Sequence, residues 1–303
     1  MVEHESLEES NISARALVIY NPAAGNGKAE RLYQELKPTL EGLGIAVERT
    51  QRPGHATELA SRVASDTDLT VISLGGDGTH HEVINGLMPT AGPIFAVLPA
   101  GTGNDLVRML QYPQGAAAML DTALHGSVKA FDIGQAGEHY FLTVAGVGFD
   151  AEVAGWVNQR KKQGNGTWVF IRGILSNLFG YRSASLEVKL SAATRSEKTF
   201  MLAAGNTQYY AGGMKICPHA SPFDGRFEII WVEAISPFGV LPLLAKVFRG
   251  THVNHPKVKV LSAPELTVTG PDRLWVHADG ELIGHLPITI RTIPHGIRIR
   301  TGG

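Results

Sequence analysis

Residues 69–87 read LTVISLGGDGTHHEVINGL, and this stretch sets the class of fold that the sequence predicts. Its first part, residues 69–74, is a short apolar run of the kind that forms a buried strand. The apolar residues after it recur at helical spacing, as Val83, Ile84 and Leu87. The residues between these two parts are Gly75, Gly76, Asp77, Gly78 and Thr79. A strand therefore leads directly into a helix through a glycine-rich turn.

The alternation of strands with helices extends over residues 16–125. Further short apolar runs predict buried strands at residues 16–20, 45–47 and 94–98. Helical spacing between the first two of these strands is shown by Leu32, Leu36 and Leu40. Pro38 predicts that this helix bends or ends there. Strands that alternate with helices indicate a parallel sheet with helices on both of its faces.

The second half of the chain has a different periodicity. Apolar and polar residues alternate at residues 186–190, 226–231 and 297–300, as in antiparallel strands with one solvated face. Two helical patterns interrupt these strands, at residues 167–179 and 238–248. The second half is therefore expected to be mostly β-structure.

These patterns predict two domains. The fold class is α/β plus mostly β, with a parallel α/β domain at residues 15–128 followed by an antiparallel β-sandwich-like domain at residues 129–303. Residues 1–14 contain a cluster of glutamates and are expected to form a flexible tail.

Composition restricts the classes of function. The formal charge of -1 provides no overall basic field for binding nucleic acid. Cys217 is the one cysteine, which favours a reducing compartment such as the cytoplasm. Because no stretch reaches the roughly 18 apolar residues of a membrane-spanning helix, any contact with a bilayer is expected to be peripheral.

The glycine-rich turn at residues 75–79 has the composition of a phosphate-binding loop. Its glycines permit positive φ angles and a close approach of the backbone to phosphate. The N-terminus of the following helix offers free N–H groups and a partial positive charge. A tight strand-to-helix turn capped by Thr79 is the simpler structural alternative.

Two further loops follow predicted strands. The first consists of Asn21, Pro22, Ala23, Ala24 and Gly25, continued by Asn26, Gly27 and Lys28; the second contains Gly101, Thr102, Gly103, Asn104 and Asp105. The first loop differs from a Walker phosphate-binding loop because it has Pro22 and Ala29 where that motif has Gly and Ser or Thr. Parallel strands end at one edge of a sheet, so three such loops predict one polyphosphate site there.

The order of these motifs resembles the diacylglycerol kinase catalytic domain family, which includes bacterial diacylglycerol kinases and sphingosine and ceramide kinases. The resemblance continues beyond the three loops through Phe131-Asp132-Ile133-Gly134, Gly146-Val147-Gly148-Phe149-Asp150, Gly212-Gly213, Pro218, Asp224-Gly225 and Asp279-Gly280-Glu281. It covers about residues 15–300. It implies that the first domain binds ATP, that the second binds a lipid, and that the active site lies in the cleft between them.

The resemblance implies that Glu281 is the catalytic base, with Asp77 and Asp279 also in the catalytic site. From the residues themselves, Asp279-Gly280 between apolar runs is equally typical of a hairpin turn. A positioned carboxylate that removes the proton of the lipid hydroxyl contributes roughly 10²–10⁴ in rate.

The resemblance also implies Mg²⁺ and nucleotide contacts. Asp77, Asp105 and Asp132 are the expected carboxylates near the catalytic Mg²⁺. Thr50 and Thr102 match nucleotide-contacting threonines of the family. A second, structural Mg²⁺ is implied at Ser221, Asp224 and Arg226, where only Asp224 offers a side-chain ligand. An ordinary turn before a strand is the alternative for this last stretch.

Residues 153–186 carry only basic charges, at Arg160, Lys161, Lys162, Arg172 and Arg182, interleaved with aromatic residues. Within this segment one helical face is predicted from Ile171, Ile174, Leu175 and Leu178. We expect the segment to dock on an anionic bilayer, where each basic residue contributes roughly 1 kcal/mol. A core helix with solvated arginines is the alternative.

The sequence therefore predicts an ATP-dependent lipid kinase at the inner membrane face, with diacylglycerol as the expected acceptor and phosphatidic acid as its product. An NAD kinase-like enzyme and a non-catalytic lipid- or nucleotide-binding regulator are the alternatives. The histidines, among them His80, His81, His252 and His255, lack metal-ligand spacing and are interpreted as incidental. The acceptor lipid and the oligomeric state, a homodimer included, stay open.

Overall fold

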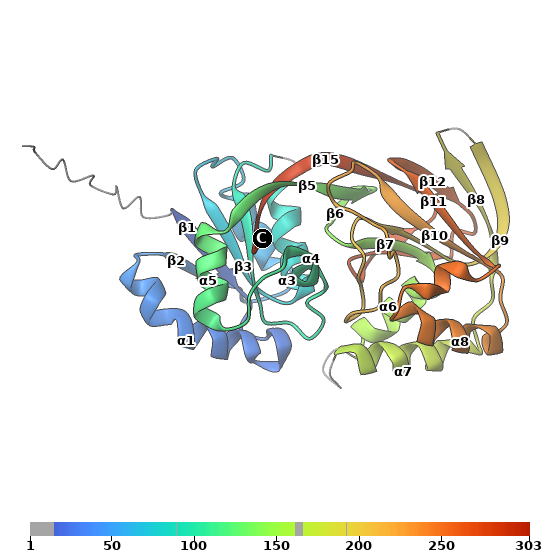
Figure 1. Ribbon diagram of the computed structural model, residues 1–303, viewed down its shortest axis with the longest axis horizontal. Helices are drawn as coiled ribbons and strands as arrows, with labels where there is room; N and C mark the ends of the chain where they lie inside the picture. Colours follow the sequence, from blue (N-terminus) through green and yellow to red (C-terminus); the bar gives the residue numbers. More distant parts are fainter. Residues whose placement is uncertain (1–14, 89, 161–165, 192) are drawn as a thin grey trace, which may run out of the picture.

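The fold is seen in a computed structural model that describes residues 15–88, 90–160, 166–191 and 193–303. The tail predicted at residues 1–14 lies outside the described residues, as do Lys161 and Lys162 of the expected docking segment. An α/β lobe and a larger β-rich lobe lie side by side (Figure 1).

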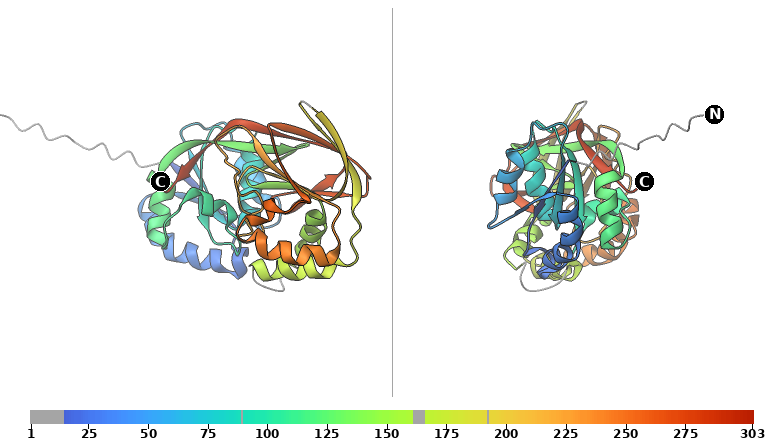
Figure 2. Two further views of the ribbon diagram at one scale, coloured as in Figure 1. Left: turned by 45° about the vertical axis from the view of Figure 1, so that its right-hand side comes forward. Right: turned by 90° about the vertical axis from the view of Figure 1, so that its left-hand side faces the viewer.

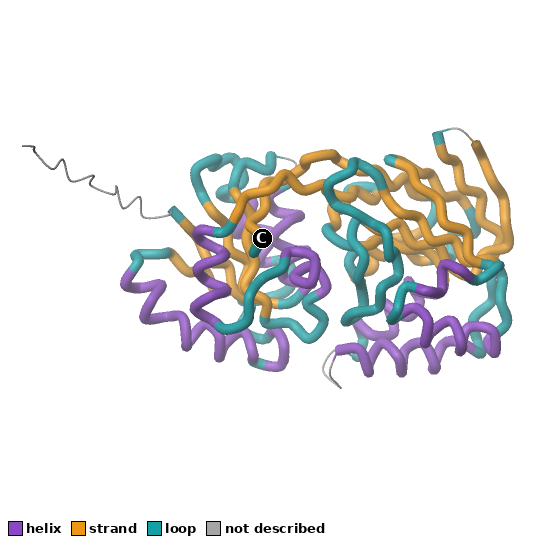
Figure 3. Tube along the Cα trace, viewed as in Figure 1, coloured by secondary structure: helices purple, strands orange, loops and turns teal. Residues whose placement is uncertain are grey.

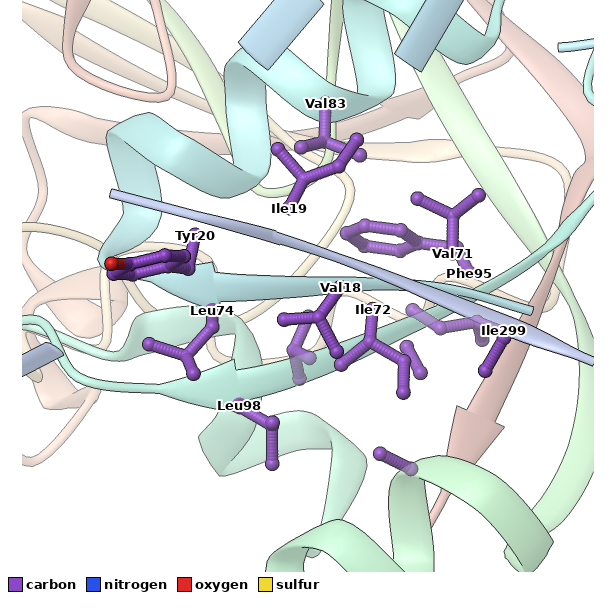
Figure 4. Close-up of a cluster of buried hydrophobic side chains, with 14 of the residues drawn as sticks. Val18, Ile19, Tyr20, Val71, Ile72, Leu74, Val83, Phe95, Leu98 and Ile299 are labelled. Carbon is purple, nitrogen blue, oxygen red and sulfur yellow. The ribbon is translucent and has the colours of Figure 1, made fainter. Parts of the chain in front are cut away.

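The α/β lobe is built on a parallel sheet. Its strands are β1 (Ala16–Tyr20), β2 (Ala46–Arg49), β3 (Thr70–Gly75) and β4 (Ile94–Pro99), in the spatial order β2-β1-β3-β4. The helices are α1 (Lys28–Gly42), α2 (His55–Ser61), α3 (Asp77–Leu87), α4 (Asp105–Leu110) and α5 (Ala116–His125), preceded by a short 3-10 turn, η1 (Ala24–Asn26). The parallel sheet predicted from the sequence is confirmed, and fully buried side chains such as Val18, Ile72 and Leu98 form its core (Figure 4).

Helix α1 does not end at Pro38, which was one of the two outcomes predicted there. The helix neither ends nor changes class there but continues to Gly42. A proline in a helix interior removes one backbone hydrogen bond and costs about 3 kcal/mol. Leu36 and Leu40 on either side of it are almost fully buried, and their burial favours a continuous helix.

The β-rich lobe is antiparallel, as predicted. Its strands are β6 (His139–Phe141), β7 (Val144–Gly148), β8 (Ala184–Leu190), β9 (Ala193–Gly205), β10 (Phe227–Glu233), β11 (Val258–Ala263), β12 (Glu265–Thr269), β13 (Trp275–Ala278) and β14 (Glu281–His285). Its helical elements are α6 (Phe149–Asn158), α7 (Gly166–Leu178), α8 (Pro237–Val247) and the 3-10 turn η3 (Thr251–Asn254). The three helices lie together at one side of the strands (Figure 3).

Strand β10 buries both of its faces, and the period of two separates its side chains into two cores, whereas β8 keeps one exposed face as predicted. On β10, Phe227, Ile229 and Trp231 point into the core between the strands. Ile230 and Val232 of the same strand belong to a second core together with residues of the helices. The helices therefore cover an apolar face of the sheet rather than a solvated one.

Two long strands connect the lobes: β5 (Ser127–Ala136) and β15 (Ile288–Thr301), which are paired with each other (Figure 1). The end of β15 lies parallel to β4, with Ile299 opposite Phe95. Phe131 of β5 and Ile299 are buried in the first lobe's core, although both follow residue 128 in the chain. The boundary between residues 128 and 129 stays a prediction.

Ile299 is fully buried at the point where β15 joins the first sheet. We expect Ile299→Ala to lower the free energy of unfolding by roughly 2–5 kcal/mol, because it removes buried methyl groups and leaves a cavity. Urea denaturation followed by circular dichroism measures this. Leu43→Ala, at a side chain that is 46% exposed, is the control and should cost less than about 0.5 kcal/mol. Equal effects of the two variants would contradict this role of β15.

Candidate functional site

Three glycine-rich loops meet at the carboxyl edge of the parallel sheet. A Cβ added at Gly25 would lie 1.9 Å from the carbonyl oxygen of Ala100, so the first and third loops are in backbone contact. A Cβ at Gly101 would lie 2.6 Å from the Cα of Gly76, which joins the third loop to the turn after β3. The predicted convergence of the loops is therefore present in the structure, and glycine is required for it.

Asn21 connects the first loop to helix α3. Its amide donates to the hydroxyl of Thr79 over 3.3 Å, and its side-chain oxygen accepts from the N–H of Ala23. Gly76 is the N-cap residue of α3 and Asp77 lies in its first turn. The partly positive N-terminus of this helix therefore belongs to the same edge as the loops.

A single pocket of about 910 Å³ opens between the lobes at this edge. Most of the predicted site residues line it: Asn21, Pro22, Ala23, Ala24, Gly25, Thr50, Gly76, Asp77, Gly78, Thr79, Gly101, Thr102, Gly103, Asp105, Asp279 and Glu281. Gly75 and Asn104 lie behind this lining. Gly75 leaves room for the Thr79 side chain, while the backbone N–H of Asn104 donates to Asp77.

Asp77 and Asp105 form a pair of carboxylates at this edge. Asp77 accepts from the backbone N–H groups of Asn104 and Asp105 at 2.9 and 3.0 Å. Asp105 accepts from the N–H groups of Gly212 and Gly213 in the second lobe, at 2.8 and 2.7 Å. Burial, and then the negative charge of Asp105, raise the pKa of Asp77 to about 7. Burial also raises the pKa of Asp105, so the pair has the electrostatics of a site for a cation.

Asp132, the third predicted carboxylate, is not among the residues that line the pocket. It is fully buried, and its oxygens accept from the N–H groups of Gly225 and His295 at 2.7 and 2.8 Å. Among the described residues, no group of three or more His, Cys, Asp or Glu side chains is placed to hold one metal ion. The expectation that Asp77 lies closest to the Mg²⁺, with Asp105 and Asp132 in support, therefore stays a prediction.

The second predicted metal site, at Ser221, Asp224 and Arg226, stays a prediction. The Asp224 carboxylate accepts from the backbone N–H of Arg226 at 3.0 Å, which is a local turn. The guanidinium of Arg226 donates to the hydroxyl and the carbonyl of Ser262.

Asp279 and Gly280 form the hairpin turn between β13 and β14, and the same turn lies in the pocket. Their φ angles of 51° and 83° are those of a tight hairpin turn. The buried Asp279 carboxylate accepts from the N–H groups of Leu142 and Thr143 at 2.9 and 2.8 Å and from the Thr143 hydroxyl at 2.6 Å. The two interpretations of this motif, hairpin and site, are thus compatible.

His81 supplies the fourth contact to Asp279, from helix α3 of the first lobe. The distance from its Nδ1 to Asp279 is 3.1 Å. Burial alone would raise the pKa of Asp279, but the hydrogen bond and charge of His81, with the bonds from Thr143 and Leu142, outweigh burial and lower it. Asp279 is therefore ionised and can only accept, so Nδ1 of His81 carries the proton.

Interpreting His81 as incidental was wrong. Histidine spacing within one helix could not reveal this contact, because Asp279 is 198 residues away in the sequence.

A second histidine–aspartate pair holds the same turn from the other side. The N–H of Gly280 donates to Nδ1 of His277 over 3.3 Å, so the proton of this ring is on Nε2. That nitrogen donates to Asp150 of α6 over 3.1 Å, and both side chains are buried. The sequence supplied Asp150 only as part of a motif, and it gave no sign that His277 would lie beside it.

Glu281 follows this turn and faces the first lobe. A Cβ at Gly78 would lie 3.3 Å from Oε1 of Glu281, so the carboxylate lies beside the glycine-rich turn. Asn158 of α6 donates to the carbonyl of Gly280 at 3.0 Å and to Oε2 of Glu281 at 3.3 Å. Asn158 was not predicted as a site residue. The base expected from the sequence therefore lies next to the loops that it was expected to serve.

Beyond Glu281 the pocket continues into the second lobe as an apolar cavity. Its lining residues there come mainly from α6, α7, α8 and the strands beneath them, and include Val153, Val157, Phe170, Ile174, Met201, Val240, Leu243 and Val247. The pocket is thus polar where the loops meet and apolar at its inner end.

Comparison with known proteins places this chain among the kinases that phosphorylate an alcohol. The family described as diacylglycerol kinase catalytic domain matches residues 15–136, and the family described as YegS C-terminal NAD kinase beta sandwich-like domain matches residues 143–301. The chain belongs to the bacterial lipid kinase family that carries the YegS C-terminal domain, and its first domain matches the diacylglycerol kinase catalytic domain.

Individual relatives are similar over almost the whole chain. The diacylglycerol kinase of Staphylococcus carnosus is 27% identical over 290 residues, covering 95% of each chain. That of Staphylococcus aureus strain MRSA252 is 28% identical over 288 residues, covering 94% of this chain and 91% of its own. A crystal structure of a diacylglycerol kinase from Bacillus anthracis superposes with a TM-score of 0.74 at 21% identity, covering 95% of this chain and 97% of that one. This last likeness confirms the fold.

Gly25 and Gly27 form a matched pair for testing the contact between loops. Both have positive φ angles, 60° and 82°, but a Cβ at Gly27 would meet nothing within 4 Å. Each change to alanine places a Cβ on backbone in the left-handed region, which should cost roughly 1–2 kcal/mol of stability. Gly25→Ala should cost roughly 1–3 kcal/mol more because its Cβ collides with backbone. Thermal unfolding of both variants measures the difference, and identical losses would show that the loops are not in contact.

Asp279→Asn should destabilise the protein in a pH-dependent way. The pKa of Asp279 is lowered in the folded state. The stability that its carboxylate contributes is therefore fully present above the ordinary pKa of about 3.9, and it is lost as pH falls through the lower pKa of the folded state. We expect a loss of roughly 2–3 kcal/mol at pH 7, as for hydrogen bonds to a charged group. The loss should shrink below about pH 4. Urea unfolding across this range is the measurement, and a loss independent of pH would contradict an ionised Asp279.

Proposed function

We propose that this kinase transfers the γ-phosphate of ATP to a lipid hydroxyl, with diacylglycerol as the expected acceptor and phosphatidic acid as the product. The observation that carries the proposal is the composition of the pocket between the lobes. It joins three glycine-rich loops in one lobe to an apolar cavity in the other, and Glu281 lies where the two meet.

The loop end of the pocket suits the triphosphate of ATP. Backbone N–H groups at the start of α3 and the glycines of the loops allow phosphate oxygens to approach closely. Thr50 and Thr102 line the same end and are proposed to contact the nucleotide.

Asp77 and Asp105 are the residues that would hold Mg²⁺. Magnesium is usually bound through one or two carboxylates together with phosphate oxygens and water, and this number of carboxylates is present. Each of their oxygens accepts a single backbone hydrogen bond among those described above, which leaves a lone pair for the ion. When bound, the ion neutralises charge on the phosphoryl group.

Glu281 is proposed to be the general base. As the lipid oxygen forms its bond to the γ-phosphorus, the bond from that phosphorus to the ADP oxygen breaks, and the hydroxyl proton moves to a carboxylate oxygen of Glu281. The turn before Glu281 is held from the first lobe by His81 and from the second by the His277–Asp150 pair. These positioning residues fix the base relative to the loops that bind phosphate.

The apolar inner end of the pocket distinguishes a lipid acceptor from the NAD alternative. NAD carries a diphosphate, two riboses and polar rings, whereas the inner lining is formed mainly by aliphatic and aromatic side chains, with few polar groups such as His252. Burying the hydroxyl and charged groups of NAD there would be unfavourable without matching polar partners. The acyl chains of a lipid need no polar partners in such a cavity.

A lipid substrate requires contact with a bilayer, and we propose that the protein is cytoplasmic and peripheral at the inner membrane face. Of the helices in the described part of the chain, none is long and apolar enough to cross a membrane. Contact through a surface is therefore the mode that the proposal uses.

The direct test is incubation of purified protein with radiolabelled ATP, Mg²⁺ and separate acceptors: diacylglycerol, monoacylglycerol, sphingosine, phosphatidylglycerol and NAD. We expect labelled phosphatidic acid from diacylglycerol. Glu281→Gln should lower kcat roughly 10²–10⁴-fold with a small change in the KM for ATP. Glu265→Gln, at an exposed glutamate of β12, is the control and should have wild-type activity.

Each other result has a definite meaning. Label in NAD alone would favour the NAD kinase-like alternative, and label in no acceptor together with ATP binding would favour a non-catalytic regulator. Full activity of Glu281→Gln would remove this residue from the mechanism while leaving the kinase assignment intact.

A further inference from the structure

Helices α7 and α8 are apolar on both of their sides. Their inner sides line the pocket, through Val169, Phe170 and Ile174 of α7 and through Val240, Leu243, Leu244 and Val247 of α8. A helix that covers a core normally has a polar outer side. The two helices depart from that rule, and their outer sides need a separate explanation.

The outer side of α7 carries a stripe of exposed large apolar residues. Trp168 is 73% exposed, Leu175 46% and Phe179, just after the helix, 57%. These positions are spaced by seven and four residues, so they lie on one side of the helix. Leu175 had been predicted on the same face as Ile174 and Leu178, but it points outward while they are buried.

The outer side of α8 carries a matching stripe. Phe238 is 75% exposed, Leu241 39% and Phe248, just after the helix, 40%. The rings of Phe179 and Phe238 are 5.8 Å apart, edge to face, which joins the two stripes. The helices also lie against each other in two views of the molecule (Figure 2, left, and Figure 1). The stripes therefore form one surface, here called the α7–α8 surface.

The charges within the two segments that form the α7–α8 surface are of one sign. Residues 166–186 and 234–264 contain no Asp or Glu. Exposed basic side chains border the apolar stripes, at Arg172, Arg182, Lys246 and Arg249. Exposed aromatic residues bordered by arginine and lysine are typical of a protein face that enters the headgroup region of an anionic bilayer.

We propose that the α7–α8 surface docks on an anionic lipid bilayer, and that the substrate enters the apolar cavity from there. The proposal rests on the lipid kinase function and names the partner that presents the substrate. The same two helices would contact the bilayer with one side and the acyl chains with the other. A lipid that moves from the bilayer to the apolar cavity then crosses only the layer formed by these two helices. The docking segment predicted at residues 153–186 did not include α8, which forms half of the α7–α8 surface.

The test uses the double variant Trp168→Asp/Phe238→Asp, which changes the two most exposed residues of the surface. Co-sedimentation with vesicles of phosphatidylglycerol and phosphatidylcholine measures docking. We expect a loss of binding of roughly tenfold or more, because two aromatic anchors are lost and two negative charges face the anionic lipid. Phosphorylation of diacylglycerol in these vesicles should fall in parallel. Activity on short-chain diacylglycerol dissolved as monomers should be unchanged, because no bilayer is needed.

The control is Leu43→Asp/Val128→Asp, which adds the same charge at exposed apolar residues of the other lobe. It should bind vesicles like the wild type, and thermal unfolding checks that both variants are folded. Unchanged vesicle binding by the Trp168/Phe238 variant would overturn the proposal. So would a wild type that binds no vesicle, in which case the surface is left for a protein partner. Absence of kinase activity on soluble and vesicle lipids alike, with docking intact, would refute the proposed function and not the docking.

Discussion

The arrangement of the site depends on one buried negative charge, the carboxylate of Asp279. A charge removed from water must be surrounded by donors, and here the donors come from both lobes: His81 from α3 and Thr143 and Leu142 from the chain between β6 and β7. Any shift of one lobe relative to the other would leave part of this charge without partners. The electrostatic requirement therefore holds the turn before Glu281 in register with the helix whose first residue is Asp77. Phosphoryl transfer depends on such positioning because the chemistry itself demands little of the protein.

The pocket combines two environments that rarely share one cavity. Its outer part is polar, with backbone N–H groups and two carboxylates whose pKa values are raised by burial. Its inner part is apolar and belongs to the core that α6, α7 and α8 complete. Under the proposed function, a lipid that fills the inner part would exclude water from the place where the phosphate is transferred, and this would limit hydrolysis of ATP. Helices α7 and α8 carry apolar side chains on both sides, toward the pocket and on the outer surface of the protein.

The features of the fold and the site that could be predicted from the sequence are those with a local sequence signal. The strands of the first lobe and the glycine turn are visible because periodicity and glycine content act over a few residues. Pro38 does not end its helix, and this could not be predicted because the burial of Leu36 and Leu40 is a tertiary effect. Leu175 was assigned to the wrong side of its helix because both sides are apolar. Motif order grouped Asp132 with Asp77, but it gave no sign that Asp132 would accept from the N–H groups of Gly225 and His295. The roles of His81 and His277 depend on contacts between distant segments, for which one sequence contains no local mark.

Strand β15 also constrains the order in which the protein can fold during its synthesis. It completes the sheet of the first lobe beside β4, although the chain crosses the whole second lobe between these two strands. During synthesis the first lobe emerges early but cannot close its core until Ile297 and Ile299 have left the ribosome. Contacts of such large sequence separation are formed slowly, because a long loop must be closed before they contribute. The edge of β4 stays open in the meantime, and an open strand edge can pair with another chain. The newly made first lobe therefore carries this open edge until the last strand of the chain has been synthesised.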